Sequence, residues 1–382
     1  MLKSNYVNSK KIIVISGISL FEGGPLSVYK DCLISMIKSG YAKQFHVIAF
    51  VHNKEDFREY MNDIEIIEIS KARKNYFYRF YYEYIFFYLY SRKRKIYIWF
   101  SIHDLTPNVK AKRQYVYCHN PSPFLKRTKS IWKYSKTVYW MSVFYKYFYK
   151  FNIKHNTAVV VQQNWLRDEF KKMFDVKNVI VARPSVNEQN YTISDFVNNE
   201  EKSDGRTIFI YAAFPRVFKN YEVICKAVEL LDDLKEKFEV WFTIDGSENQ
   251  YAKDLKTRYS YNSSIKWLGL LDRDVLAELY QKSDCMIFPS LLETWGLPIT
   301  EYKATGNPVI MADLKYAHET IGTYGKAVFF DPQNERQLAE LMRSKVRGCM
   351  NTYAVKASPI KEPFADSWNR LWEMLVQDGN ER

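Results

Sequence analysis

The sequence predicts an α/β chain made of two doubly wound domains, each with a parallel sheet. The first observation is length, because 382 residues exceed the roughly 100–200 residues of an average domain. The second is the alternation of short β-branched runs with helical segments in both halves of the chain. The third is composition, since 47% hydrophobic and 26% charged residues exclude intrinsic disorder and collagen-like chains.

The first half, residues 1–185, is predicted to form one domain. It opens with a β-branched run at 11–16, which is typical of a buried parallel strand. Gly23 and Gly24 make a turn, and Pro25 precedes a helix at 26–38, because proline suits the start of a helix. Further strands are expected at 45–51, 64–69, 95–100, 114–117 and 157–161.

The polar stretch 186–206 is predicted to link this domain to a second one at 207–360. The last segment, 361–382, is predicted to contain an amphipathic helix at 364–376. In the second domain, strands are expected at 207–213, 239–244, 265–268, 284–289, 308–312 and 327–330, and helices at 221–234, 272–282, 298–305 and 335–346.

Charge and cysteine usage bear on location and partners. The net charge is +13, with +18 in residues 1–190 and −5 in the remainder, so the first half is suited to an anionic surface. Five scattered cysteines without a paired motif favour a reducing cytosol over a disulfide framework or a zinc site. With no signal peptide and no apolar run of about 20 residues, the protein is expected to be cytoplasmic, either soluble or peripheral on the membrane.

The stretch 288–301 is the most informative part of the chain. A buried strand ends there, and Gly296 and Pro298 lead into a helix whose first N–H groups favour an anion such as phosphate. Glu301 is expected in the first turn of that helix, where a carboxylate can accept two ribose hydroxyl groups. The alternative is that Glu301 only stabilises the helix dipole. Glu293, in the loop, is placed to hold sugar hydroxyls.

A second signal follows the strand at 207–213. Arg216 and Lys219 lie at a carboxyl strand end, where open α/β sheets bind ligands, and can neutralise a leaving diphosphate. The alternative is an ordinary solvated loop. Asp272 and Asp274 resemble a metal-binding Asp-x-Asp pair, but Asp272 is better explained as a helix N-cap, so no metal site is expected.

Together these residues resemble glycosyltransferase family four, the retaining GT-B enzymes. The resemblance rests on two glutamates separated by seven residues with Trp-Gly-Leu-Pro between them, on the Arg216 and Lys219 pair, on the Gly-Gly loop and on the loop at 313–319. It implies two Rossmann-like domains facing across a cleft. The sugar nucleotide is then held mainly by the second domain, and the final helix crosses back to the first.

The resemblance also implies roles for single residues. Glu301 binds ribose, Glu293 touches the transferred sugar, and Arg216 and Lys219 bind the diphosphate, although these two lie closer together than in commoner members. His119 falls where the family often has a cleft histidine near the reacting sugar. The implied catalytic residues are Glu293, Arg216, Lys219 and His119, and the implied donor-binding residues are Glu301, Gly296, Leu297, Pro298, Trp295, Thr294, Gly23 and Gly24.

The implied activity is transfer of a hexose, with retention, from a UDP- or GDP-sugar to a lipid-linked glycan acceptor in bacterial surface polysaccharide synthesis. No cofactor is expected, because the sugar nucleotide is a substrate. Two alternatives stay open. One is a non-catalytic membrane- or nucleic-acid-binding protein on a GT-B-like fold, and the other is a glycan phosphorylase.

A basic and aromatic region bears on the choice between an enzyme at the membrane and a binding protein. Residues 105–167 contain twelve basic and no acidic residues, and residues 76–90 contain eleven aromatic ones. Such a region, 126–154 above all, suits a helix in the headgroup layer of an anionic membrane. The alternatives are a core helix with solvated lysines or, less favoured for want of any nucleic-acid signature, a base-stacking surface. His103 and Asp104 are expected either to line the cleft or to serve only as loop residues.

Overall fold

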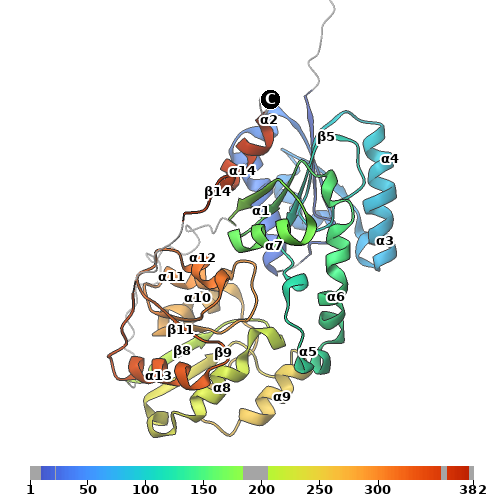
Figure 1. Ribbon diagram of the computed structural model, residues 1–382. Coiled ribbons are helices and arrows are strands. Elements are labelled where there is room, and N and C mark those ends of the chain that lie inside the picture. Colours follow the sequence, from blue (N-terminus) through green and yellow to red (C-terminus); the bar gives the residue numbers. More distant parts are fainter. Residues whose placement is uncertain (1–9, 22, 184–204, 354–358, 378–382) are drawn as a thin grey trace, which may run out of the picture. The chain divides into compact units, whose positions relative to one another are not determined.

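The structure, a computed structural model, describes residues 10–21, 23–183, 205–353 and 359–377. The chain divides into two units, each built on its own parallel sheet (Figure 1). The first unit comprises Met1–Asn120, Phe144–Ser185 and Ile360–Arg382, and the second comprises Pro121–Val143 and Val186–Pro359. The predicted linker lies outside the described residues, except for Gly205 and Arg206.

The first sheet has eight parallel strands in the order β14-β7-β6-β5-β4-β1-β2-β3. Chain order reverses between β1 and β4, so their carboxyl ends form the switch point where open α/β sheets bind ligands. The strands are β1 (Ile12–Ser16), β2 (His46–Val51), β3 (Glu65–Glu68), β4 (Ile96–Ser101), β5 (Ala111–Cys118), β6 (Ala158–Val161), β7 (Val179–Ala182) and β14 (Phe364–Ala365).

Helices cover both faces of this sheet. Trp372 belongs to the core on one face, and Phe87 and Trp99 belong to the core on the other, under a helical segment that contains a π-helical turn, Tyr82–Phe86. The helices are α1 (Gly23–Lys38), α2 (Tyr41–Gln44), α3 (Tyr76–Tyr81), α4 (Phe87–Arg92), α6 (Lys136–Lys150), α7 (Asn164–Phe174) and α14 (Trp368–Val376). The boundary between the units falls inside α6.

The predicted helix at 364–376 is wrong at its start. Phe364 and Ala365 form β14 and pair with Val181 and Ala182 of β7. Neither of these two strands was expected from the sequence. Helix α14 begins only after Ser367, whose hydroxyl accepts the Arg370 backbone N–H at 3.3 Å as an N-cap. The helix then packs on α1, where Trp372 Nε1 donates to the Cys32 carbonyl at 3.4 Å.

The second sheet has six parallel strands in the order β10-β9-β8-β11-β12-β13. The sequence did not indicate α9, whose buried Tyr251, Ala252, Leu255 and Tyr259 follow a helical spacing. The strands are β8 (Thr207–Tyr211), β9 (Phe238–Phe242), β10 (Ile265–Trp267), β11 (Cys285–Phe288), β12 (Val309–Ala312) and β13 (Ala327–Phe330). The helices are α8 (Tyr221–Glu229), α9 (Gln250–Tyr259), α10 (Arg273–Lys282), α11 (Leu297–Lys303), α12 (Lys315–Ile321) and α13 (Glu335–Val346).

Residues 121–143 belong to the second unit, whereas the sequence placed them in the first domain. The reason is α5 (Lys129–Tyr134), which packs on α9. The Tyr134 ring meets Tyr251 edge-on with centroids 5.3 Å apart, and Lys133 Nζ lies 3.4 Å from Asp254 Oδ2.

Candidate functional site

The loop after β8 carries the two predicted cations at the carboxyl edge of the second sheet. Arg216 precedes a single 3-10 turn, Val217–Lys219, and Lys219 is its last residue. Asn220 ends this turn with φ 58°, and its amide donates to the carbonyls of Pro289 at 3.3 Å and Pro332 at 2.9 Å. Because those carbonyls follow β11 and β13, one side chain joins the loops of three strands at this edge.

Lys219 and Glu293 are brought together by the structure. Lys219 Nζ donates to Glu293 Oε1, and the two side chains are 17% and 13% exposed. No described residue accepts the other two N–H bonds of this ammonium group. Arg216 is exposed, and its guanidinium lies 5.9 Å from the centroid of the Phe214 ring. This edge therefore presents two cations, of which Glu293 neutralises one.

The loop from β11 to α11 is held by hydrogen bonds and by a glycine. Trp295 is buried, and its Nε1 donates to Thr300 Oγ1 at 3.0 Å. Gly296 has φ 84°, and a Cβ added there would lie 2.9 Å from Ile299 Cδ1, so only glycine fits without rearrangement. Leu297 is already helical, and Pro298 lies in the first turn of α11. Thr294 is half-buried between Glu293 and Trp295.

Glu301 lies in the second turn of α11, not in the first as the sequence suggested, because the helix begins at Leu297. Its carboxylate is 14% exposed and lies 3.5 Å from the Arg273 guanidinium. Sequence reasoning missed Arg273 because it weighed only the two acids beside it. Asp272 occupies the N-cap position of α10, as the sequence predicted, although its side chain makes no capping hydrogen bond.

In the first unit, Gly23 and Gly24 begin α1 and do not precede it as a separate turn. Gly23 has φ 67°, and no atom lies within 4 Å of a Cβ added there, so its backbone is open to close approach. Within the described residues, no three or more His, Cys, Asp or Glu side chains are grouped closely enough to hold a metal ion.

His119 follows β5 at the carboxyl edge of the first sheet. Its side chain is 7% exposed, with Nε2 4.0 Å from Asp104 Oδ1 and its ring edge-on to Tyr117 at 5.7 Å. Its Nδ1 is buried and has no hydrogen-bond partner among the described residues.

A buried polar cluster lies next to this histidine. His103 Nε2 lies 3.0 Å from Glu83 Oε1, with both side chains fully buried. Burial raises the pKa of Glu83 to about 8, although Arg79 opposes the shift, and burial lowers the pKa of His103 well below its ordinary value. Near neutral pH both groups are therefore mostly uncharged, and the contact joins a carboxylic acid to an imidazole. The sequence predicted His103 either in the cleft or in a plain loop, but its contact with Glu83 could not be predicted, because the two residues come from separate elements.

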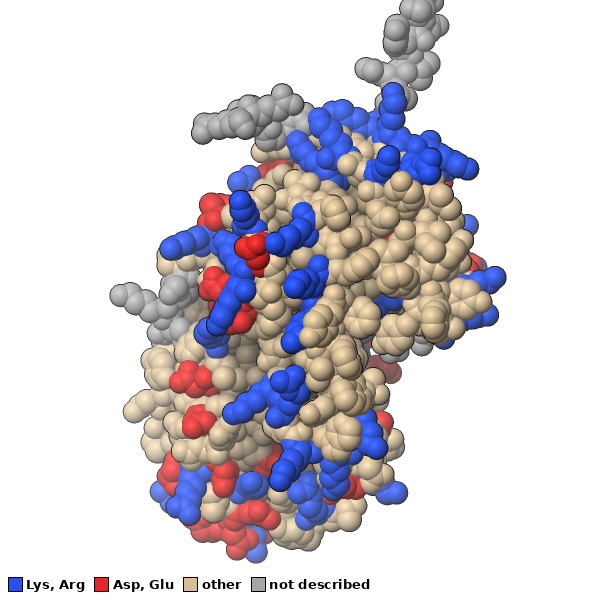
Figure 2. Space-filling model, turned by 45° about the vertical axis from the view of Figure 1, so that its right-hand side comes forward, with Lys and Arg blue, Asp and Glu red and all other residues tan. Residues whose placement is uncertain are grey.

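Large side chains, most of them aromatic, are exposed on the helices of the first unit, and we call this set the aromatic surface. The region is also partly core, because Tyr145 and Tyr149 of α6 are buried. Figure 2 shows a face of the molecule on which a broad uncharged surface is bordered by basic groups. None of the helices that the structure describes has the length and apolar character needed to span a bilayer. The members of the aromatic surface are Tyr76, Phe77, Tyr78, Phe80, Tyr81, Ile85, Leu89, Phe144, Tyr147, Phe148 and Phe151.

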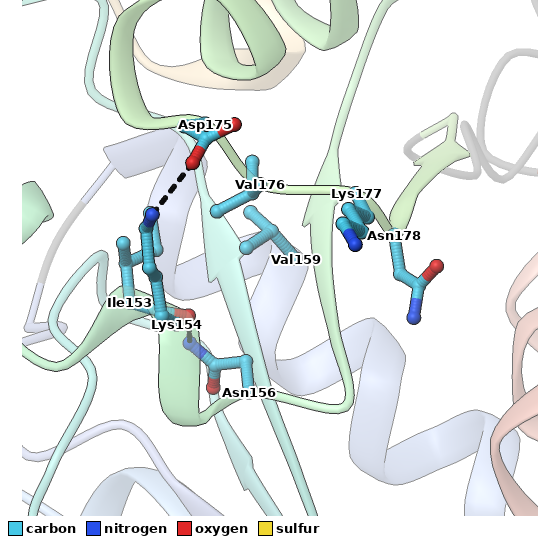
Figure 3. A pocket seen from close by; sticks show the side chains of 8 residues that line it. All are labelled: Ile153, Lys154, Asn156, Val159, Asp175, Val176, Lys177 and Asn178. Carbon is cyan, nitrogen blue, oxygen red and sulfur yellow. Dashed lines mark hydrogen bonds and ion pairs between the residues drawn. The ribbon is translucent and has the colours of Figure 1, made fainter.

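A cavity of about 300 Å³ lies elsewhere in the first unit, next to the amino ends of β6 and β7 (Figure 3). Lys154 and Asp175 line it and form an ion pair of 2.7 Å. Open α/β sheets bind their ligands at the carboxyl ends of the strands, so this cavity lies at the wrong edge for the candidate site.

Comparison with known proteins bears on the second unit in particular. Residues 192–348 match the family model described as "Glycosyl transferases group 1". The O-antigen chain mannosyltransferase RfbU of Salmonella typhimurium is 26% identical over 198 residues, which cover 51% of this chain and 52% of RfbU. The chain thus spans about half the length of this curated relative. Lys219, Glu293 and Glu301 all lie inside the segment that matches the family model.

Solved structures resemble nearly the whole chain. A glycosyltransferase from Rickettsia africae has a TM-score of 0.63 at 16% identity, covering 96% of this chain and 92% of that one. Anabaena Alr3699/HepE, crystallised with UDP-glucose, has a TM-score of 0.58 at 14% identity, covering 95% and 94%. At these identities the likeness concerns the fold alone. The two parallel α/β units therefore have the fold of GT-B glycosyltransferases, as the sequence predicted.

Proposed function

We propose that this protein is a retaining glycosyltransferase that moves a hexose from a nucleotide-sugar to a glycan acceptor. The observation that carries the proposal is the Lys219–Glu293 ion pair at the carboxyl edge of the second sheet. It lies within the segment that matches the glycosyl transferases group 1 model. RfbU is named an O-antigen chain mannosyltransferase, which favours a mannose donor and a surface polysaccharide as the product.

In this proposal the donor diphosphate binds at Arg216 and Lys219, and Glu301 binds the ribose hydroxyls in exchange for its contact with Arg273. Support comes from the exposure of Arg216 and from the N–H bonds of Lys219 that no described residue accepts. Charge-assisted hydrogen bonds to phosphate are about twice as strong as neutral ones. Trp295 and Gly296 hold the shape of the loop, and Glu293 accepts hydroxyl groups of the transferred sugar.

The anomeric configuration is retained in this proposal because the acceptor hydroxyl attacks the anomeric carbon from the same face that the diphosphate leaves. The bond between the anomeric carbon and the diphosphate oxygen breaks, and the diphosphate keeps the electron pair. The acceptor hydroxyl then attacks from the same side and passes its proton to a phosphate oxygen of the leaving group. Arg216 and Lys219 stabilise the negative charge that develops there, which is how fixed cations accelerate such a step without a metal. In this proposal the His119 side chain, which is 7% exposed, contacts a hydroxyl group of the reacting sugar.

A thermal-shift panel tests the donor site. UDP, GDP, dTDP, ADP and CMP are compared, since a ligand at about a hundred times its dissociation constant stabilises by about 2.7 kcal/mol. We expect one nucleotide to stabilise the wild type but not Glu301→Ala. Glu340→Ala is the matched control, because Glu340 lies in the same unit and is 74% exposed. If no nucleotide raises the melting temperature, the result contradicts the proposal and favours a non-catalytic binding protein on the same fold.

We further propose that the acceptor is lipid-linked and that the protein docks on the cytoplasmic face of an anionic membrane. Support comes from the aromatic surface, where Phe77 is 87% exposed and Tyr147 is 57% exposed. Basic residues among these rings attract anionic headgroups at about 1 kcal/mol each. Of the predicted basic and aromatic region, residues 76–90 and 144–154 lie in the first unit, and residues 126–143 lie in the second.

Vesicle sedimentation tests this docking. We expect binding to vesicles rich in phosphatidylglycerol and little binding to phosphatidylcholine alone. Phe77→Ser combined with Phe148→Ser should weaken binding at least about tenfold, because two rings then lose their apolar contact with the bilayer. Phe214→Ser is the control, since Phe214 is 47% exposed but lies in the second unit. Equal binding by both variants contradicts docking through the aromatic surface.

A further inference from the structure

Asp104 follows β4 at the switch point of the first sheet and has an uncommon backbone conformation. Its φ is 74°, a region that side chains other than glycine, asparagine and aspartate seldom adopt. Such conformations persist where the surroundings hold them, often at ligand sites. We propose that Asp104 is a positioning residue for His119 in the transfer reaction. This inference rests on the proposed function and names a residue that the proposal above does not use.

The Asp104 carboxylate accepts hydrogen bonds from four donors. Oδ1 accepts the backbone N–H groups of His119 at 2.8 Å and of Asn120 at 3.1 Å. The Tyr149 hydroxyl lies 2.9 Å from the same oxygen, and the Tyr145 hydroxyl lies 3.0 Å from Oδ2. Two successive N–H groups on one carboxylate fix the direction in which the chain leaves β5.

The chain around Asp104 is itself held on both sides. Its own N–H donates to the Tyr117 carbonyl of β5 at 3.2 Å. The preceding carbonyl, of His103, accepts from Arg79 at 2.8 Å, and Arg79 also interacts electrostatically with Asp104 and Tyr145. A buried carboxylate is tolerated only when it is paired and hydrogen-bonded, and here both conditions are met.

These contacts set the place of the His119 ring. The ring is attached to a backbone that Asp104 holds, so loss of the carboxylate frees the residue that is proposed to contact the sugar. A displacement of about 1 Å at a reacting centre can cost about a hundredfold in rate. The donor, in contrast, is proposed to bind in the second unit, so its affinity should not depend on Asp104.

Helix α6 supplies the support for this carboxylate. Tyr145 and Tyr149 are its buried members, whereas Tyr147 on the same helix belongs to the aromatic surface. One helix therefore contributes both to the proposed membrane contact and to the hydrogen bonds behind His119. Tyr41→Phe, on α2 (Tyr41–Gln44) of the same unit and outside the aromatic surface, is the control for the double variant Tyr145→Phe with Tyr149→Phe.

The variants of Asp104 separate the carboxylate from the backbone conformation. Asp104→Gly keeps the positive φ accessible but removes both carboxylate oxygens. Asp104→Asn also tolerates this φ and keeps one side-chain oxygen that can accept the N–H groups. Selective ¹⁵N-histidine labelling reports six backbone amides, among them those of His119 and His318. His318 lies in the second unit and serves as the internal reference.

We expect the His119 amide to exchange about 10- to 100-fold faster in Asp104→Gly, because a charge-assisted hydrogen bond is lost. In Asp104→Asn it should exchange within about threefold of the wild-type rate, since an oxygen acceptor is retained. The kcat for transfer should fall about 10- to 100-fold in Asp104→Gly, with the KM for the donor within about threefold, and Asp104→Asn should recover most of it. The tyrosine double variant should behave as a weaker form of Asp104→Gly, and Tyr41→Phe should behave as the wild type.

Unchanged exchange at His119 in Asp104→Gly overturns the proposal. So does faster exchange with an unchanged kcat, since the held loop would then not matter to the reaction. A wild-type protein that transfers no sugar contradicts the proposed function instead. The exchange measurement distinguishes that failure from a failure of Asp104 to hold the loop.

Discussion

The ion pair between Lys219 and Glu293 must be rearranged when an anionic donor binds, and this makes it the sharpest test of the site. Lys219→Met leaves Glu293 without its cation, and Glu293→Gln leaves Lys219 without its anion. Removing one partner of a fully buried pair costs about 3–5 kcal/mol, whereas exposed pairs contribute about 0–1 kcal/mol. With side chains 17% and 13% exposed, this pair lies nearer the buried limit.

We therefore expect Lys219→Met to destabilise the second unit by about 2–3 kcal/mol, which is about 4–12 °C in Tm for a domain of roughly 150–250 residues. The double variant should lose less than the sum of the single variants, with a coupling of about 1–2 kcal/mol. Scanning calorimetry of the wild type, both single variants and the double variant gives this cycle. Additive losses would show that the contact contributes no coupling energy.

Nucleotide binding separates the two partners further. Lys219→Met should weaken nucleoside diphosphate binding about 10- to 100-fold, because a charge-assisted contact to phosphate is lost. Glu293→Gln should change it by less than about threefold, since it removes a competitor for Lys219 rather than a phosphate ligand. Isothermal titration calorimetry measures both, with Lys219→Arg as the variant that keeps the charge. Equal losses in Lys219→Met and Glu293→Gln would refute the assignment of Lys219 to the diphosphate.

Two further perturbations test the structure around the sites. Gly296→Ala should cost about 1–3 kcal/mol more than Gly306→Ala in urea denaturation, because both have positive φ but only at Gly296 does an added Cβ meet a side chain, Ile299, at 2.9 Å. Equal losses would contradict the clash. Burial raises the pKa of Glu83 from its ordinary 4.5 to about 8, so the folded state keeps a proton that the unfolded state releases between these values. The wild type should therefore lose stability relative to Glu83→Gln as the pH rises from about 4.5 to about 8, and a Tm difference that is constant with pH would argue against a buried neutral carboxyl.

Local patterns predicted the sheets well, because buried parallel strands are β-branched runs that need no knowledge of their partners. Residues 11–16 are an example, since β1 forms at Ile12–Ser16 in the middle of its sheet. Phe364 and Ala365 show the limit, because a strand of two residues has no periodicity. It exists only because β7 offers an open edge to pair with.

The candidate site was predictable where its residues share one loop and unpredictable where they meet from distant elements. Glu293, Gly296 and Pro298 could be placed from their order along the chain, and Gly296 does adopt the positive φ that a glycine permits. Arg273, which contacts Glu301, comes from another helix and carries no pattern of its own. Tyr145 and Tyr149 lie in the basic and aromatic region, where no local pattern distinguishes exposed rings from these two, whose hydroxyls donate to Asp104.

Asp104 and Lys219 show how burial and pairing separate a structural charge from a charge reserved for a ligand. The Asp104 carboxylate accepts hydrogen bonds from two backbone N–H groups and two tyrosine hydroxyls, so its oxygens already have donors before any substrate binds. Lys219 has one carboxylate partner, and no described residue accepts its remaining N–H bonds. A carboxylate such as that of Asp104 fixes the geometry of the chain around it and tolerates little change. An ammonium group such as that of Lys219 can exchange its carboxylate partner for a more highly charged diphosphate. The same reasoning explains why the loss of Asp104 should lower kcat and the loss of Lys219 should weaken donor binding.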